Sequence, residues 1–121
     1  MRESTWHVKY DVAAIVLPKE LNHLPAIPLC RAKLRPGSRV YIAAFPKGVP
    51  VITIGQVAGY TAGGTKMYHT AATTGGSSGG MIIDAAGNLC GVHLGVDTSL
   101  GYKYATPSDL IIRLVNAHGR R

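Results

Sequence analysis

Short apolar segments, each bounded by residues that favour tight turns, recur along the chain from residue 38 onward. They cover residues 38–45, 51–60, 66–72, 79–84, 88–96 and 100–106. The separators contain glycine, proline, aspartate or serine, which supply the backbone dihedral angles that tight turns require. Short strands at this spacing predict an all-β fold, either an antiparallel barrel or a sandwich.

The first part of the chain is organised differently. Residues 9–18 form an apolar run that ends in proline, and they predict one further strand. Residues 19–37 contain three prolines and no apolar periodicity, so they predict an extended connection and a domain boundary.

The end of the chain predicts one helix, over residues 107–118. Leu110, Ile111 and Leu114 recur there at helical spacing, and Ser108 is a residue type that caps helix N-termini. A single terminal helix packed against a small barrel is therefore expected.

The composition limits the choice of partners and compartments. The chain has 13 Lys and Arg against 6 Asp and Glu, a formal net charge of +7. Its basic residues are spread along the sequence, so RNA binding is kept only as a minor alternative to a mildly basic surface. The first residues lack the apolar region of a signal peptide, and no apolar run approaches the roughly 18 residues that suggest a membrane span.

Cys30 and Cys90 are the only cysteines. Neither lies in a CxxC or Cys/His pattern, so we expect no metal and no cofactor. Cysteines in apolar segments are more often buried thiols than a disulfide, which fits a reducing cytosol.

The segment that suggests chemistry is Gly76-Ser77-Ser78-Gly79-Gly80, which joins two predicted strands. A serine nucleophile needs an exposed hydroxyl on a sharp turn, and glycines permit that backbone and a close approach of substrate. The same turn can direct the amides of Gly76 and Ser78 at a developing oxyanion. Two alternatives stay open: a glycine- and serine-rich hairpin loop without chemistry, and Ser77 as the nucleophile. A strand on both sides of the turn argues against the strand-to-helix elbow of α/β-hydrolases.

The stretch from this turn to a G-x-H-x-G segment resembles the nucleophile region of chymotrypsin-like proteases, and most of all that of the sobemovirus-like serine proteases of RNA viruses. The resemblance implies a Greek-key fold with residues 1–18 as a remnant of the N-terminal barrel and residues 19–37 as the interdomain connection. Residues 38–121 would then form a complete C-terminal barrel with the terminal helix.

The resemblance also assigns roles to individual residues. Thr73, five residues before Ser78, and His93, fifteen after it, would line a specificity pocket that favours Glu or Gln before the scissile bond. Asp11, at the start of an apolar strand, would orient a catalytic histidine. The alternative for His93 is a buried structural histidine, and the alternative for Asp11 is a residue that caps a turn.

The order in this family is histidine, aspartate, serine, and no histidine of this chain matches it. His7 lies only four residues before Asp11, while His23, His69 and His118 follow it. A serine without a general base is a weak nucleophile. We therefore expect a fragment whose missing N-terminal segment carries the base, inactive and poorly soluble alone, with an apolar strand lacking its neighbours.

The sequence thus predicts a serine endopeptidase that acts on a polypeptide. The resemblance to viral proteases implies that this polypeptide is a viral polyprotein and that the enzyme works in the host cytoplasm. A cellular protease of the bacterial stress type is a close variant. A non-catalytic protease-like barrel that binds RNA or a polyprotein partner is the main alternative. The last alternative is a small β-barrel that is unrelated to proteases.

Overall fold

The computed structural model describes residues 4–7, 12–15, 17–21, 23–61, 63–73 and 78–118. Its strands are β1 (Ser4–His7), β2 (Val12–Ile15), β3 (Arg39–Ala44), β4 (Val51–Tyr60), β5 (Met67–His69), β6 (Met81–Asp84), β7 (Leu89–Asp97) and β8 (Tyr102–Pro107). The helix α1 spans Ser108–His118, and two short 3₁₀ helices span Lys19–Leu21 and Pro46–Gly48.

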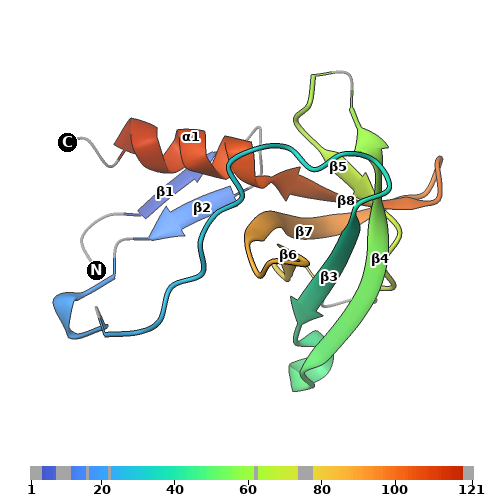
Figure 1. The fold of residues 1–121 in the computed structure, drawn as a ribbon. Helices are drawn as coiled ribbons and strands as arrows, with labels where there is room; N and C mark the ends of the chain where they lie inside the picture. The colour runs from blue at the N-terminus through green and yellow to red at the C-terminus, as the bar shows by residue number, and fades with distance from the viewer. Residues whose placement is uncertain are drawn as a thin grey trace.

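Strands β3 to β8 form a closed antiparallel barrel in the order β3-β4-β5-β8-β7-β6 (Figure 1). The pairs β5–β8 and β3–β6 join strands that are not consecutive, which is the Greek-key arrangement predicted for the C-terminal part of the chain. The predicted all-β class with one C-terminal helix is confirmed. Strand β5 is shorter than the predicted segment 66–72.

Alternate side chains of the strands point into the barrel and fill its interior. In β3 the alternation is plain, because Val40, Ile42 and Ala44 are buried while the residues between them are more exposed. A strand points successive side chains to opposite faces, so this alternation puts the apolar set inside. The buried apolar cluster consists of Val40, Ile42, Ala44, Val57, Met67, Ala71, Ile82 and Ala105.

The N-terminal strands form a separate hairpin beside the helix (Figure 1). Strand β2 pairs with β1 in antiparallel register, and α1 contacts this hairpin as well as β7 and β8. The expectation that the strand within residues 9–18 lacks any neighbour was therefore wrong. The sequence missed β1, whose residues Ser4–His7 show no apolar run.

The start of the helix is anchored differently from the prediction. The hydroxyl of Ser108 is buried and donates a hydrogen bond of 2.8 Å to the carbonyl of Cys30. The side chain predicted to cap α1 therefore ties the helix to the connection that leads into the barrel.

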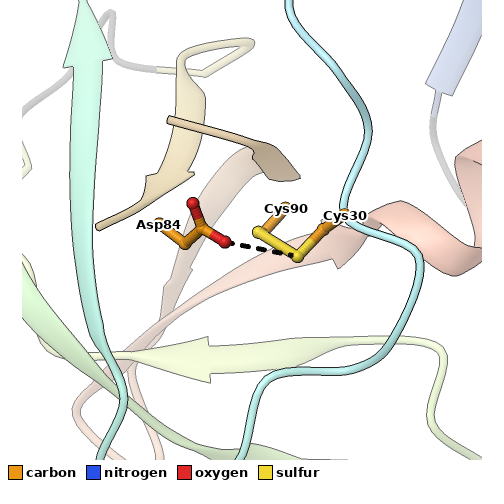
Figure 2. A group of neighbouring side chains, drawn as sticks. All are labelled: Cys30, Asp84 and Cys90. Atoms are coloured by element: carbon orange, nitrogen blue, oxygen red, sulfur yellow. Dashed lines mark hydrogen bonds between the residues drawn. A yellow bond between two sulfur atoms is a disulfide. The ribbon is translucent and has the colours of Figure 1, made fainter. Parts of the chain in front are cut away.

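The connection is fastened to β7 at the same place. Cys30 and Cys90 form a disulfide, drawn in Figure 2, and the Cys30 amide donates to the Leu89 carbonyl at 2.9 Å. The expectation of two unpaired thiols was wrong, because 60 residues separate them in sequence and only the fold brings them together. The expectation of a reducing cytosol was based on unpaired thiols, so the disulfide removes the reason for it. Disulfides persist mainly in oxidising compartments.

Among the residues that the structure describes, no helix combines the length and the apolar character needed to cross a membrane.

Candidate active site

Ser78 lies on an exposed turn immediately before β6. Gly79 follows it with a φ of +85°, in the left-handed region that only glycine adopts without strain. The predicted need for glycine beside the serine is thus met at this position. The turn presents the Ser78 side chain at the surface of the barrel.

Two backbone hydrogen bonds fix this turn against strand β7. The Gly79 amide donates to the His93 carbonyl at 2.7 Å, and the His93 amide donates to the Gly80 carbonyl at 2.9 Å. The Ser78 hydroxyl donates to the carbonyl of Leu94, the next residue of β7, at 2.7 Å. The structure therefore brings two of the predicted site residues, Ser78 and His93, to neighbouring positions.

A depression of about 240 Å³ adjoins the serine. Its lining consists of Ala43, Ala44, Phe45, Ser78, Gly79, Gly80 and Met81. The lining is mostly apolar, and Phe45 within it is 68% exposed. A hydroxyl at the edge of a small apolar depression is a suitable place for an extended peptide to present a carbonyl group.

His93 is buried inside the barrel, where it meets a second histidine. Nε2 of His69, on β5, lies 3.0 Å from Nδ1 of His93, and the Ala71 amide donates to Nδ1 of His69 at 3.2 Å. Both rings are at most 2% exposed. Because Nδ1 of His69 accepts a hydrogen bond from the Ala71 amide, the proton of a neutral His69 is on Nε2.

This arrangement determines the protonation of the second ring. His69 donates from Nε2, so Nδ1 of His93 must accept, and the proton of His93 is left on Nε2. Burial lowers the pKa of His69 to about 4, and the coulombic effects of His93 and Lys103 act in the same direction. Burial and the Lys103 charge also lower the pKa of His93. Both imidazoles are therefore neutral near pH 7.

The remaining predicted site residues are placed only in part. Thr73 is half-buried in the segment that follows β5, and its predicted role in a specificity pocket stays a prediction. Asp11, Gly76 and Ser77 lie outside the described residues. Their predicted roles in orienting a histidine and holding an oxyanion therefore also stay predictions.

The described histidine side chains do not offer a base to Ser78. His69 and His93 use ring nitrogens in their mutual hydrogen bond inside the barrel. Nδ1 of His23 lies 2.9 Å from the Glu20 carbonyl, in the connection. Within the part of the chain that the structure describes, the hydroxyl of Ser78 is held by the Leu94 carbonyl alone.

One group of side chains has the composition of a metal site. Ligand atoms of Cys30, Asp84 and Cys90 lie within 4.8 Å of one another, and Sγ of Cys30 is 3.7 Å from Oδ2 of Asp84 (Figure 2). The disulfide removes both thiolates, and Oδ1 of Asp84 accepts from the Ala86 and Asn88 amides. With the disulfide formed, the Asp84 carboxylate is the one metal-ligand group left in this cluster. Its hydrogen bonds stabilise the turn between β6 and β7.

In the sequence, His69 is excluded as the catalytic histidine because it follows Asp11, and no role is assigned to Lys103. The structure places His69 against His93 and pairs it across the sheet with Lys103. The only signal in the sequence was that both histidines interrupt apolar strands, and no sequence pattern shows which strands become neighbours.

Comparison with known proteins supports the same fold. The family model described as "Trypsin-like peptidase domain" matches residues 3–92, well over half of the chain. No curated protein matches the chain significantly.

Three solved structures illustrate the likeness. The HtrA-type protease AlgW with a decapeptide is 28% identical, with a TM-score of 0.67 over 89% of this chain and 36% of that one. The serine endoprotease of Yersinia pestis is 22% identical, with a TM-score of 0.69 over 79% and 36%. The active form of the Rv3671c protease of M. tuberculosis is 18% identical, with a TM-score of 0.76 over 93% and 55%.

The chain spans between about a third and just over half of the length of these proteases. The two structures under 25% identity show a shared fold, and the family match reaches from the first residues into β7 and includes the turn of Ser78. On this evidence the chain belongs to the trypsin-like peptidase domain family.

Proposed function

We propose that this protein is a serine endopeptidase in which Ser78 is the nucleophile. The observation that supports this most is the placement of an exposed serine on a glycine turn, fixed to β7 beside an apolar depression. Oγ of Ser78 would attack the carbonyl carbon of a peptide bond, and the amides of Gly76 and Ser78 would bind the oxyanion. The amine leaves with a proton, and water then hydrolyses the acyl-enzyme.

The proton of Ser78 has to go to a base. The Leu94 carbonyl accepts the hydrogen bond of this hydroxyl but is an amide oxygen and cannot take its proton. We propose that a histidine oriented by Asp11 does so, and that the 121-residue chain alone has low activity. The described histidines support this, since His23, His69 and His93 make their hydrogen bonds elsewhere.

The substrate preference we propose is Glu or Gln before the scissile bond, with Thr73 and His93 as its determinants. The tautomer of His93 supports this, because its Nε2 bears a proton that a carboxylate or amide oxygen could accept. A viral polyprotein as the substrate, and the host cytoplasm as the compartment, rest on the resemblance of the G-x-H-x-G segment alone. A cellular peptidase would use the same chemistry.

A fluorophosphonate probe tests the nucleophile. The reagent transfers its phosphonyl group to an activated serine oxygen and releases fluoride, and mass spectrometry locates the modified residue. With imidazole added as an external base, we expect modification at Ser78 that is lost in Ser78→Ala and retained in Ser77→Ala. Equal labelling of the Ser78→Ala variant would show that the nucleophile is a different residue.

A non-catalytic, protease-like barrel is the second candidate. The observation that favours it is the Ser78 hydroxyl, which is held by a backbone carbonyl in the described part of the chain rather than by a histidine. Such a protein would use its basic surface to bind RNA or a polyprotein segment. Salt-sensitive RNA binding together with absent fluorophosphonate labelling, even with added imidazole as a base, would favour this function over the first.

A further inference from the structure

Lys103 lies on the interior face of the barrel. It is directly opposite His69 in the β5–β8 pair, and opposed residues of an antiparallel pair share a face. His69 is fully buried in the interior, so Lys103 extends from the same face.

The position of Lys103 along its strand places it near the end of this interior. Ala105, two residues further along β8, is fully buried and opposes both Met67 and His93. Lys103 itself is half-buried, and the residue before it, Tyr102, is exposed. The strand thus runs from the solvent toward the histidine pair, with Lys103 between the two.

The same stretch of β7 faces both this lysine and the candidate nucleophile. Lys103 is opposite Val96 in the β7–β8 pair, two residues beyond Leu94, whose carbonyl accepts the Ser78 hydrogen bond. Between them lies Gly95, which pairs with Tyr104 and faces its ring on the other side of the sheet. Ser78 and Lys103 are therefore joined to positions of β7 that are two residues apart, and His93 is the residue before the first of them.

Two polar groups at this end of the barrel lack partners within the described chain. Lys103 makes no ion pair with any described residue, whereas Lys33 pairs with Asp109 at 3.2 Å. The proton-bearing Nε2 of His93, in a ring that is 2% exposed, makes no hydrogen bond to a described residue. A buried donor without a partner is costly, and a ligand that accepts from it would remove this cost.

The charge of such a ligand follows from the protonation of the cluster. Both histidines are neutral. A second proton on His93 would have to lie on Nδ1, which already accepts the hydrogen bond from Nε2 of His69. Lys103 is then the only cation of the three. A carboxylate would meet both the N–H of His93 and an ammonium, whereas an uncharged amide would leave the ammonium without a counter-charge.

We propose that Lys103 supplies the positive charge of a carboxylate-binding subsite, in which Nε2–H of His93 and the Lys103 ammonium together bind the acidic side chain of a peptide. His69 is a positioning residue that holds His93 in the donor tautomer. This inference rests on the proposed function, since the peptide is brought to the subsite by binding at Ser78. It narrows the proposed preference from Glu or Gln to Glu.

Binding of two matched peptides tests the subsite without requiring catalysis. The probes are N-acetyl-Ala-Ala-Glu-amide and N-acetyl-Ala-Ala-Gln-amide, titrated into the full chain with the imidazole nitrogens of its histidines followed by ¹⁵N NMR. We expect the Glu peptide to bind about tenfold more tightly and to shift the His93 Nε2 resonance. In Lys103→Met the ratio of the two Kd values should fall to near one, and Lys103→Arg should restore part of it.

The matched control is Lys66→Met. It removes the same charge from a lysine whose ammonium lies 4.6 Å from the centre of the Tyr104 ring, on the other face of the sheet. This variant should keep the wild-type ratio, and thermal unfolding of each variant establishes that it is folded. Equal Kd ratios in wild type and Lys103→Met, or absence of binding by the Glu peptide, would overturn the inference.

The fluorophosphonate experiment keeps this inference distinct from the proposed function. Labelling of Ser78 without discrimination between the peptides would contradict the proposed subsite and support Ser78 as the nucleophile. Discrimination that depends on Lys103, without labelling of Ser78, would contradict the proposed peptidase function and support a site that recognises acidic peptides.

Discussion

Nε2 of His69 lies 3.0 Å from Nδ1 of His93 across the interior of the barrel, although the two residues come from strands that are not paired with each other. Strand β8 separates β5 from β7, and its small Ala105 leaves room for the two rings to meet. Since both rings are buried and the contact needs neutral imidazoles, the barrel depends on the protonation of this pair.

Acidification is therefore expected to destabilise the protein through His69. The unfolded chain takes up a proton there near pH 6.5, whereas the folded protein does so only near its pKa of about 4. Between these values the unfolded state binds more protons, so the free energy of unfolding falls as the pH is lowered. The expected loss at pH 5 is roughly 2 kcal/mol, measured by urea denaturation across this range.

Two variants separate this effect from general acid denaturation. His69→Gln should flatten the pH dependence between pH 6.5 and 4, while His23→Gln, which changes an exposed histidine of the connection, should leave the slope intact. The same slope in all three proteins would contradict the role given to His69.

Reduction of the Cys30–Cys90 disulfide should weaken the fold. The bond closes a loop over a sequence separation of 60 residues and fastens the connection to β7. Loop-closure entropy predicts a loss on the order of 4 kcal/mol in the free energy of unfolding. Denaturation with and without a reducing agent measures it, and the double variant Cys30→Ala, Cys90→Ala is the control that should not respond to the reagent. A wild-type midpoint that stays the same after verified reduction of the disulfide would be inconsistent with this role.

Gly55 is expected to tolerate no side chain. A Cβ at this position of β4 would overlap the backbone of Ala71 and approach its Cβ to 2.9 Å. Gly55→Ala should therefore destabilise the barrel by about 1–3 kcal/mol, because β4 and the segment after β5 must move apart. Gly63→Ala is the matched control, since its nearest neighbour would be Thr65 at 3.8 Å and thermal unfolding should change little.

Much of this fold could be predicted from the positions of turn residues. The predicted strand at residues 51–60 coincides with β4, and the helix predicted for residues 107–118 is found at Ser108–His118. A proline precedes each of them, Pro50 before β4 and Pro107 before α1, and proline has a strong local conformational preference. The starts of both elements could therefore be predicted from the local sequence.

The missed features depend on contacts between distant segments. Strand β1 has no apolar alternation and is stabilised by pairing with β2 and by contact with α1. The disulfide and the histidine pair join residues 60 and 24 positions apart. Strand order and register decide such contacts, and a shift of one residue would turn Lys103 from the interior to the outer face.

The candidate site was predicted in the same uneven way. The glycine turn at Ser78 was recognisable because its backbone requirement is local, and the structure confirms the left-handed Gly79. His93 was recognised from its flanking glycines through a family resemblance. His69 and Lys103 were not, since their relation to His93 exists only in the closed barrel.

The most direct measurement of the central claim is the release of nitrophenolate from the 4-nitrophenyl ester of N-acetylglutamate, with imidazole added as an external base. The leaving group of this ester needs no proton, so the assay requires only a nucleophile, a base and an oxyanion site. We predict a slow reaction that imidazole accelerates, that remains in Ser77→Ala and that falls to the rate of free imidazole in Ser78→Ala. An imidazole-dependent rate that is the same in Ser78→Ala and in the wild type would contradict the assignment of Ser78 as the nucleophile.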